Sequence, residues 1–226
     1  MFAPRSSAAC LSARAPSNSP MAPVAAELNQ IGSSLFIWQA YDPPAKSDLF
    51  STALVTAAGT FVIDPIALQP PEFARLRKRG HVAGVVVTNA NHERAAMSYS
   101  GKLSVPIFAT ADAFSHAKPE HFVELQDGDR IENEIVVIEI PGAVAGEVAL
   151  YHEGDGGTLI IGDALINFEP YGFTFLPTKY CRDQRQMRRS LRKLLDREAR
   201  RMFFAHGLPI LSDAGMRLRQ LLDISS

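Results

Sequence analysis

A short run of polar side chains follows the most apolar strand pattern in the chain. Residues 82–87 read VAGVVV, and the next seven residues, TNANHER, include Asn89, Asn91, His92, Glu93 and Arg94. The continuous apolar run predicts a strand that is covered on both faces. In α/β proteins, functional groups commonly lie between the end of such a strand and the following helix. This segment is therefore a candidate functional site, although the pattern alone does not specify a reaction.

Composition indicates an ordinary globular protein. The chain has 226 residues, 46% of them hydrophobic, and a formal net charge of −1. No apolar run approaches the roughly 18 residues of a membrane-spanning helix, so we predict no membrane crossing and a cytoplasmic location. Cys10 and Cys181 are far apart in unlike contexts, which predicts neither a disulfide framework nor a thiolate metal site.

The N-terminus differs in composition from the rest. Residues 1–26 are rich in Ala, Ser and Pro, carry Arg5 and Arg14, and contain no acidic residue before Glu27. Two alternatives remain: a disordered tail or a start placed too early, with Met21 as the true start, or a leader-like segment. Composition favours the first. The predicted folded domain is residues 27–226.

The order of predicted elements is β-rich, then βα units, then β-rich again, then helix, strand and helix. We expect strands at 34–40, 50–56, 60–64, 82–88, 105–108, 122–125, 134–140, 147–151, 158–161 and 202–205. We expect helices at 72–79, from about 93, at 183–199 and at 212–222, with a helical turn at 111–117. Two sheets with helices on their outer faces would satisfy this order.

Five landmarks in this order resemble one known family. They are FVIDP at 61–65, the segment opened by Thr88, PG at 141–142 followed by GEVALY at 146–151, IIGD at 160–163, and AHG at 205–207. From about Leu35 to Ile210 the chain is similar to the metallo-β-lactamase fold superfamily. The resemblance implies an α/β fold, a four-layer αβ/βα sandwich of two mixed β-sheets with helices on the outer faces. It also implies a metal site between the sheets.

The resemblance also implies metal ligands, and most of them are replaced. A two-zinc site of this family uses five histidines and two aspartates. Only Asp163 and His206 match the expected ligands, and Asp64 matches a supporting residue. The other positions hold Asn89 and Asn91 for the first two histidines, Glu93 for the motif aspartate, Arg94 for the last histidine and Ala143 for the third. We therefore predict that the usual dinuclear zinc site is largely lost.

Two states of the remaining site stay open. In one, a single divalent metal (zinc, iron or manganese) binds weakly to Asp163, His206, Glu93 and His92. In the other, no metal binds, and the guanidinium of Arg94 acts as a counterion for Glu93 and Asp163. His92 falls on a spacer position of the motif, so the resemblance does not assign it a role.

Two functions follow from these states. The first is a divergent hydrolase that acts on a small ester, thioester or similar acyl compound. The second is a non-catalytic protein that binds a ligand or partner in the same pocket. That pocket would contain Asp64, Asn89, Asn91, His92, Glu93, Arg94, Ala143, Asp163 and His206.

Two further segments allow two interpretations each. The basic helical segment 179–201 is either a solvated outer face or a surface that attracts nucleic acid or another anionic partner; the first is favoured. Tyr171, Phe173, Phe175 and Leu176 either border the pocket or pack in the core, and core packing is favoured.

Overall fold

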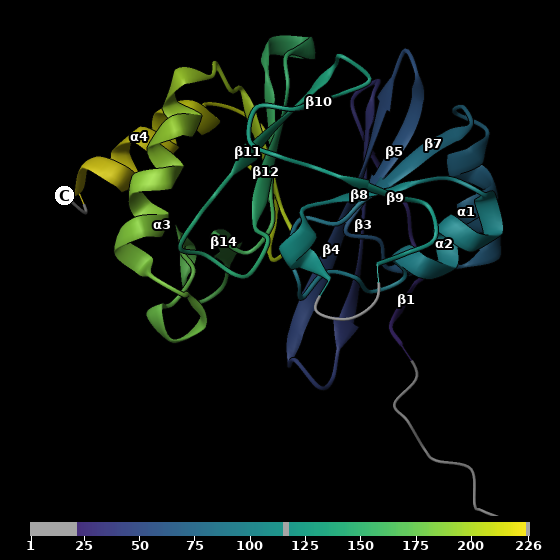
Figure 1. Ribbon diagram of the computed structural model, residues 1–226, viewed down its shortest axis with the longest axis horizontal. Helices are drawn as coiled ribbons and strands as arrows, with labels where there is room; N and C mark the ends of the chain where they lie inside the picture. The colour runs from purple at the N-terminus through teal and green to yellow at the C-terminus, as the bar shows by residue number, and fades with distance from the viewer. Residues whose placement is uncertain (1–21, 115–117, 225–226) are drawn as a thin grey trace, which may run out of the picture.

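A computed structural model describes residues 22–114 and 118–224. Two mixed β-sheets face each other across the middle of the molecule, and helices cover both outer faces (Figure 1). The prediction of an α/β four-layer sandwich is confirmed. The arrangement follows from burial: each sheet has one face against the other sheet and one face under its own helices, so its strands are apolar on both sides.

The N-terminal half contains a seven-stranded sheet in the order β2-β3-β4-β5-β7-β8-β9. Its strands are β2 Asn29–Ile31, β3 Leu35–Asp42, β4 Ser47–Thr56, β5 Gly59–Ile63, β7 Val82–Val86, β8 Ile107–Ala109 and β9 Phe122–Glu124. β2 to β5 are antiparallel, and β5, β7, β8 and β9 are parallel. Helices α1 (Pro70–Arg77) and α2 (Ala96–Leu103) supply the crossover connections and cover the outer face.

The C-terminal half contains a five-stranded sheet in the order β10-β11-β12-β13-β16. Its strands are β10 Arg130–Ile131, β11 Ile135–Glu139, β12 Val148–His152, β13 Thr158–Ile161 and β16 Arg201–Phe204. β13 and β16 are parallel, and the other pairs are antiparallel. Helices α3 (Gln184–Leu191) and α4 (Ala214–Ile224) cover the outer face (Figure 1).

Three hydrophobic cores correspond to the three interfaces between layers. Phe61 and Ile63 of the first sheet meet Leu150 and Phe203 of the second in the central core. The first outer core lies under α1 and α2, and the second lies under α3 and α4.

Several short elements complete the fold. The 3₁₀ turns are η1 (Ala111–Ala113), η2 (Gly154–Gly156), η3 (Thr178–Tyr180) and η4 (Arg192–Asp196). The hairpin of β14 (Leu165–Phe168) and β15 (Gly172–Phe175) was not expected from the sequence. Phe175 and Leu176 are buried in the outer core, and Phe173 packs partly buried against it, whereas Tyr171 is exposed. The core packing predicted for this segment is therefore confirmed except at Tyr171.

Two predicted boundaries are wrong. The helix expected at 183–199 ends at Leu191 and continues as the 3₁₀ turn η4, because that tighter winding keeps Leu194 beside Leu191 on the core face. The fold also begins before residue 27, since β1 (Val24–Ala25) pairs in parallel with β6 (Ala67–Leu68) and buries Ala25. The tail prediction for residues 1–21 and part of the turn expected at 111–117 lie outside the described residues.

Among the described residues, no helix combines the length and the apolar character needed to cross a bilayer. This finding agrees with the absence of a long apolar run in the sequence.

Candidate metal centre

Four strand ends converge at one edge of the sandwich. Asp64 follows β5 and His92 follows β7, which is the parallel neighbour of β5. Asp163 follows β13 and His206 follows β16, which are also parallel neighbours. Parallel neighbours end at the same edge of their sheet. A hydrogen bond of 2.9 Å from the Phe50 N–H to the Ala205 carbonyl joins the two sheets beside this edge.

Three side chains form a compact set of metal-binding atoms. One ligand atom each of His92, Asp163 and His206 lies within 4.8 Å of the other two. Nε2 of His92 is 3.2 Å from Oδ1 of Asp163, and Nε2 of His206 is 3.3 Å from the same oxygen. His92 and Asp163 are buried, and His206 is partly exposed. Two imidazoles and one carboxylate are a donor set that suits zinc or ferrous iron.

Asp64 fixes the orientation of His92. Its Oδ2 lies 2.9 Å from Nδ1 of His92, and the Thr88 N–H and hydroxyl donate to its two oxygens. With the proton on Nδ1, the free electron pair of His92 is on Nε2. That Nε2 atom is buried and has no hydrogen-bond partner among the described residues, although Asp163 is near. A buried, unpaired ring nitrogen aimed at a carboxylate and a second imidazole is what a metal ligand requires.

The other two candidate ligands also have polar partners outside the cluster. Nδ1 of His206 lies 3.3 Å from the hydroxyl of Ser47, at the start of β4, which is a longer contact than that between His92 and Asp64. The other oxygen of Asp163 accepts a hydrogen bond of 3.1 Å from the amide of Asn91, which is exposed. All three candidate ligands therefore have an outer partner that restrains them.

Without metal, protonation balances the charges in this cluster. Burial lowers the pKa of His92, but the carboxylates of Asp163 and Asp64 outweigh burial and raise its pKa to about 9. Burial alone would raise the pKa of Asp163, yet the charge of His92 and the close approach of both imidazoles hold it well below its ordinary value. A proton on His92 thus takes the place of a cation between two carboxylates.

At the positions that the resemblance assigns to the first zinc, the side chains form hydrogen bonds with one another and with the backbone. The Asn89 oxygen accepts from the Asn91 N–H at 2.9 Å, and the Asn89 amide donates to Oε2 of Glu147 at 2.6 Å. Oε1 of Glu147 accepts from the Ala164 N–H at 2.9 Å. The side chain of Ala143 is fully buried in the outer core under α3.

Glu147 is a site residue that sequence reasoning missed. It precedes the buried strand β12 and is only 3% exposed. Burial, together with the negative charge of Asp163, raises its pKa to about 8, against the opposing effects of His92 and of the hydrogen bonds from Ala164 and Asn89. The available signal was a carboxylate directly before the apolar run VALY, where a buried charge is unusual.

Two sequence-based assignments at the centre differ from what the structure places there. Glu93 is exposed and lies outside the group of candidate ligands. The Arg94 guanidinium donates to the carbonyls of Phe50, Asp64 and Ala205; among the described contacts it forms no ion pair with Glu93 or Asp163, although the carboxylates of Asp64 and Asp163 raise its pKa against the larger effect of burial. Arg94 also acts electrostatically on Asp64. Burial alone would raise the pKa of Asp64, but His92 and, to a smaller extent, the charge of Arg94 lower it.

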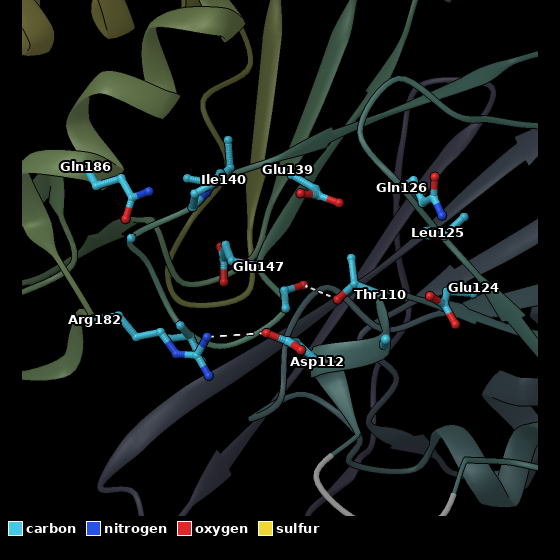
Figure 2. A pocket seen from close by; sticks show the side chains of 15 residues that line it. Thr110, Asp112, Glu124, Leu125, Gln126, Glu139, Ile140, Glu147, Arg182 and Gln186 are labelled. Atoms are coloured by element: carbon cyan, nitrogen blue, oxygen red, sulfur yellow. Dashed lines mark hydrogen bonds and ion pairs between the residues drawn. The ribbon is translucent and has the colours of Figure 1, made fainter.

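A cleft of about 420 Å³ is lined by residues of both halves of the fold, among them Glu147 (Figure 2). Thr110 and Asp112 line it from the first half, and Glu139 and Arg182 line it from the second. Arg182 and Asp112 reach across it and form an ion pair of 3.3 Å. Glu147 also lines the cleft and connects it to Asn89, whereas the three candidate ligands are not among the lining residues.

The fold and the centre agree with the family to which the chain belongs. The sequence matches the profile described as Metallo-beta-lactamase superfamily over residues 29–224, which is most of the chain. The protein is therefore a member of the metallo-β-lactamase superfamily. Comparison with curated protein sequences gives no match.

Solved structures show the same fold at low sequence identity. The DIM-1 metallo-beta-lactamase matches with a TM-score of 0.70 and 16% identity over 91% of this chain and 100% of its own. A metallo-beta-lactamase from Pontibacter korlensis matches with a TM-score of 0.67 and 17% identity over 87% of this chain and 98% of its own. Metallo-beta-lactamase IND-7 matches with a TM-score of 0.63 and 19% identity over 87% of this chain and 97% of its own. These similarities establish the fold and leave the activity open.

Proposed function

We propose that the protein is a hydrolase that works with a single divalent metal held by His92, Asp163 and His206. The observation that carries the proposal is the state of His92. Its Nδ1 is held by Asp64, and its buried Nε2 has no hydrogen-bond partner within the described part of the chain and faces Asp163 and the second imidazole. Burying a ring nitrogen without a partner is costly, and a metal ion would remove that cost.

The donor set leaves coordination positions for a substrate or a water molecule, because three protein ligands are fewer than a catalytic zinc or iron accepts. A metal at this position supplies Lewis acidity and an activated water. The residues of the chain set the geometry: Asp64 fixes the His92 ring, Asn91 fixes Asp163, and Ser47 contacts His206. The partial exposure of His206 marks the side from which a substrate would approach.

The cleft that Glu147 lines is a second candidate space for the substrate; Asn89 and Asn91 connect it to Asp163, and the three ligands do not line it. Its volume of about 420 Å³ suits a small molecule. Small esters, thioesters and related acyl compounds fit the activity expected from the fold. Glu147, which lines the cleft and has a pKa raised to about 8, places a carboxyl group that can hold a proton near neutral pH beside that space.

A second candidate function rests on a separate observation. Asn89 and Glu147 form a hydrogen bond with each other at the position that the resemblance assigns to the first metal, which supports the loss of the dinuclear arrangement. This favours a protein that binds a small ligand in the cleft without turning it over. Both candidates use the same cleft, so activity measurements are needed to separate them.

Metal content and turnover test the proposal together. Protein purified without chelator is analysed for zinc, iron and manganese, and then assayed with ester, thioester and lactam substrates with each metal added. The proposal expects close to one metal per chain and turnover that chelator abolishes and metal restores. Protein with one metal per chain and no turnover on any substrate class would support the binding function instead. Protein that takes up no metal would overturn the proposed centre.

A further inference from the structure

The outer surface at α3 has a charge unlike that of the whole chain. Residues 179–193 contain seven Lys and Arg residues and one acidic residue, Asp183, although the chain has a net charge of −1. The carboxylate of Asp183 caps α3 by accepting the Gln186 N–H at 3.0 Å. The apolar side chains of α3, Met187 and Leu191, are fully buried. The outer side of the helix is therefore basic, and it faces away from the sheets (Figure 1).

Two arginines on this surface are exposed and unpaired. Arg185 and Arg189 lie one helical turn apart, and neither has a hydrogen-bond or ion-pair partner among the described residues. Residues at this spacing lie on one side of a helix, with Cβ atoms about 5–6 Å apart. Arg182, also exposed, precedes the helix and is held only by the exposed pair with Asp112. Such exposed pairs are weak and exchange readily.

Exposed aromatic rings lie at the N-terminal end of the same surface. Tyr180, in η3, is 58% exposed, and Nζ of Lys179 lies 4.6 Å from its ring centre. Tyr171, at the tip of the β14–β15 hairpin, is 63% exposed and packs edge-on against Phe168. A basic helix face with aromatic rings at one end combines phosphate-binding and base-stacking groups.

The chemistry of this surface distinguishes between anionic partners. A membrane-binding helix needs apolar side chains that enter the lipid, and those of α3 are buried in the core. Six of the eight residues of α3 are polar or charged, and its basic residues are all arginine, whose planar guanidinium binds phosphate in a bidentate manner. Exposed tyrosines add stacking, which a duplex with paired bases would not use.

We propose that Tyr180, Arg185 and Arg189 form a binding surface for single-stranded nucleic acid, in which the arginines contact successive phosphates and Tyr180 stacks on a base. The surface is separate from the metal centre. The proposal does not depend on the proposed hydrolase activity, because binding through α3 requires neither metal nor turnover.

Fluorescence anisotropy with a labelled 20-nucleotide oligouridine tests this proposal on the full chain at several salt concentrations. Salt-dependent binding is expected, with the same affinity for metal-loaded and chelator-treated protein. The double variant R185E/R189E should lose at least tenfold in affinity and reduce the slope of log K against log salt by about 1.4. Tyr180→Ala should weaken binding of the single strand about tenfold and leave weak duplex binding unchanged. An oligothymidine of the same length distinguishes RNA from DNA as the preferred strand.

The matched control is R217E/R219E, which makes the same change in net charge at two exposed arginines of α4. The proposal expects this control to retain most of the affinity. Circular dichroism and thermal unfolding establish that each variant is folded. An equal loss in both double variants would show only general charge attraction and would overturn the proposal. Absence of binding at low salt, or preferential binding to vesicles containing phosphatidylserine, would also overturn it.

Discussion

Nδ1 of His92 lies 2.9 Å from Oδ2 of Asp64, and both side chains are buried. This contact decides which nitrogen of His92 is available to the centre. Asp64 itself is held by the Thr88 N–H and hydroxyl at the end of the neighbouring strand. Strand pairing between β5 and β7 therefore positions the imidazole through one carboxylate, and the same imidazole meets Asp163 of the second sheet.

The pH dependence of stability tests the charge balance of the metal-free centre. The folded-state pKa of His92 is about 9, above its ordinary value of 6.5. The stabilising contribution is fully present below pH 6.5 and is lost as the pH rises through 9. Glu147, with a pKa raised to about 8, also makes the folded protein less stable as the pH rises toward 8. Urea unfolding of chelator-treated protein should show a loss on the order of 3 kcal/mol from His92 between these pH values.

His92→Gln is the control for this pH effect. Gln cannot take up a proton, so the variant should be less stable near pH 6 and should lose the His92 part of the pH dependence. A wild-type stability that stays constant or rises between pH 6.5 and 9 would show that His92 is not the charged bridge between the two carboxylates.

Glu93 and His92 are adjacent in sequence and differ in their expected effect on metal binding. Glu93 is exposed and lies outside the ligand group, whereas His92 supplies a buried nitrogen to it. Glu93→Gln should therefore keep the metal content of the parent, and His92→Gln should lower metal affinity at least tenfold. Elemental analysis after dialysis against metal-free buffer measures both. Loss of metal in Glu93→Gln would assign the carboxylate back to the site.

Arg94 should contribute strongly to stability through the three carbonyls it binds. Arg94→Met keeps most of the side-chain volume and leaves the carbonyls of Phe50, Asp64 and Ala205 with fewer donors. We expect a loss of about 2–4 kcal/mol in urea unfolding. Arg217→Met on the exposed side of α4 is the matched control and should change stability by less than about 0.5 kcal/mol. Equal effects in the two variants would contradict the role assigned to Arg94.

Gly162 allows the two halves to approach each other at the centre. A Cβ atom at this position would lie 2.6 Å from the Thr88 hydroxyl oxygen, 2.8 Å from Oε1 of Glu147 and 2.9 Å from the Asn89 amide nitrogen. Gly162→Ala should destabilise the protein by about 1–3 kcal/mol and weaken metal binding, because it displaces the buried Asn89–Glu147 pair. Thermal unfolding and a metal titration measure the two effects.

Gly101→Ala is the control for this substitution. Gly101 lies in α2, and a Cβ atom there meets no atom within 4 Å. The change should raise stability by up to about 1 kcal/mol, because Ala favours the helix. If Gly162→Ala were as stable as Gly101→Ala, the packing at the centre would be looser than the distances indicate.

The fold was predictable from the sequence because its evidence is spread over the chain. Strands such as β5 and β7 are apolar on both faces, and the landmarks at Asp64, Asp163 and His206 each follow a strand. Errors in single elements, such as the length of α3, do not change the order of layers. Helical periodicity does not distinguish an α-helix from a 3₁₀ turn when Leu191 and Leu194 both remain on the core face.

The direction of side chains in the segment after β7 was not predictable. His92 N–H bonds to the Asn89 carbonyl in a turn, and Arg94 adopts a φ of 39°. The turn places His92 inward and Glu93 outward, the reverse of the directions that the motif spacing implied. Glu147 escaped notice for a related reason: its partners, Asn89 and Ala164, are distant in sequence.

The central claim is that one metal ion binds at His92, Asp163 and His206 and that no second ion binds beside Asn89. Anomalous diffraction from crystals equilibrated with Zn²⁺ or Mn²⁺ tests it most directly. The account predicts one anomalous peak, with Nε2 of His92, Nε2 of His206 and a carboxylate oxygen of Asp163 at about 2.0–2.2 Å. An empty centre at saturating metal, or a second peak between Asn89 and Glu147, would contradict it.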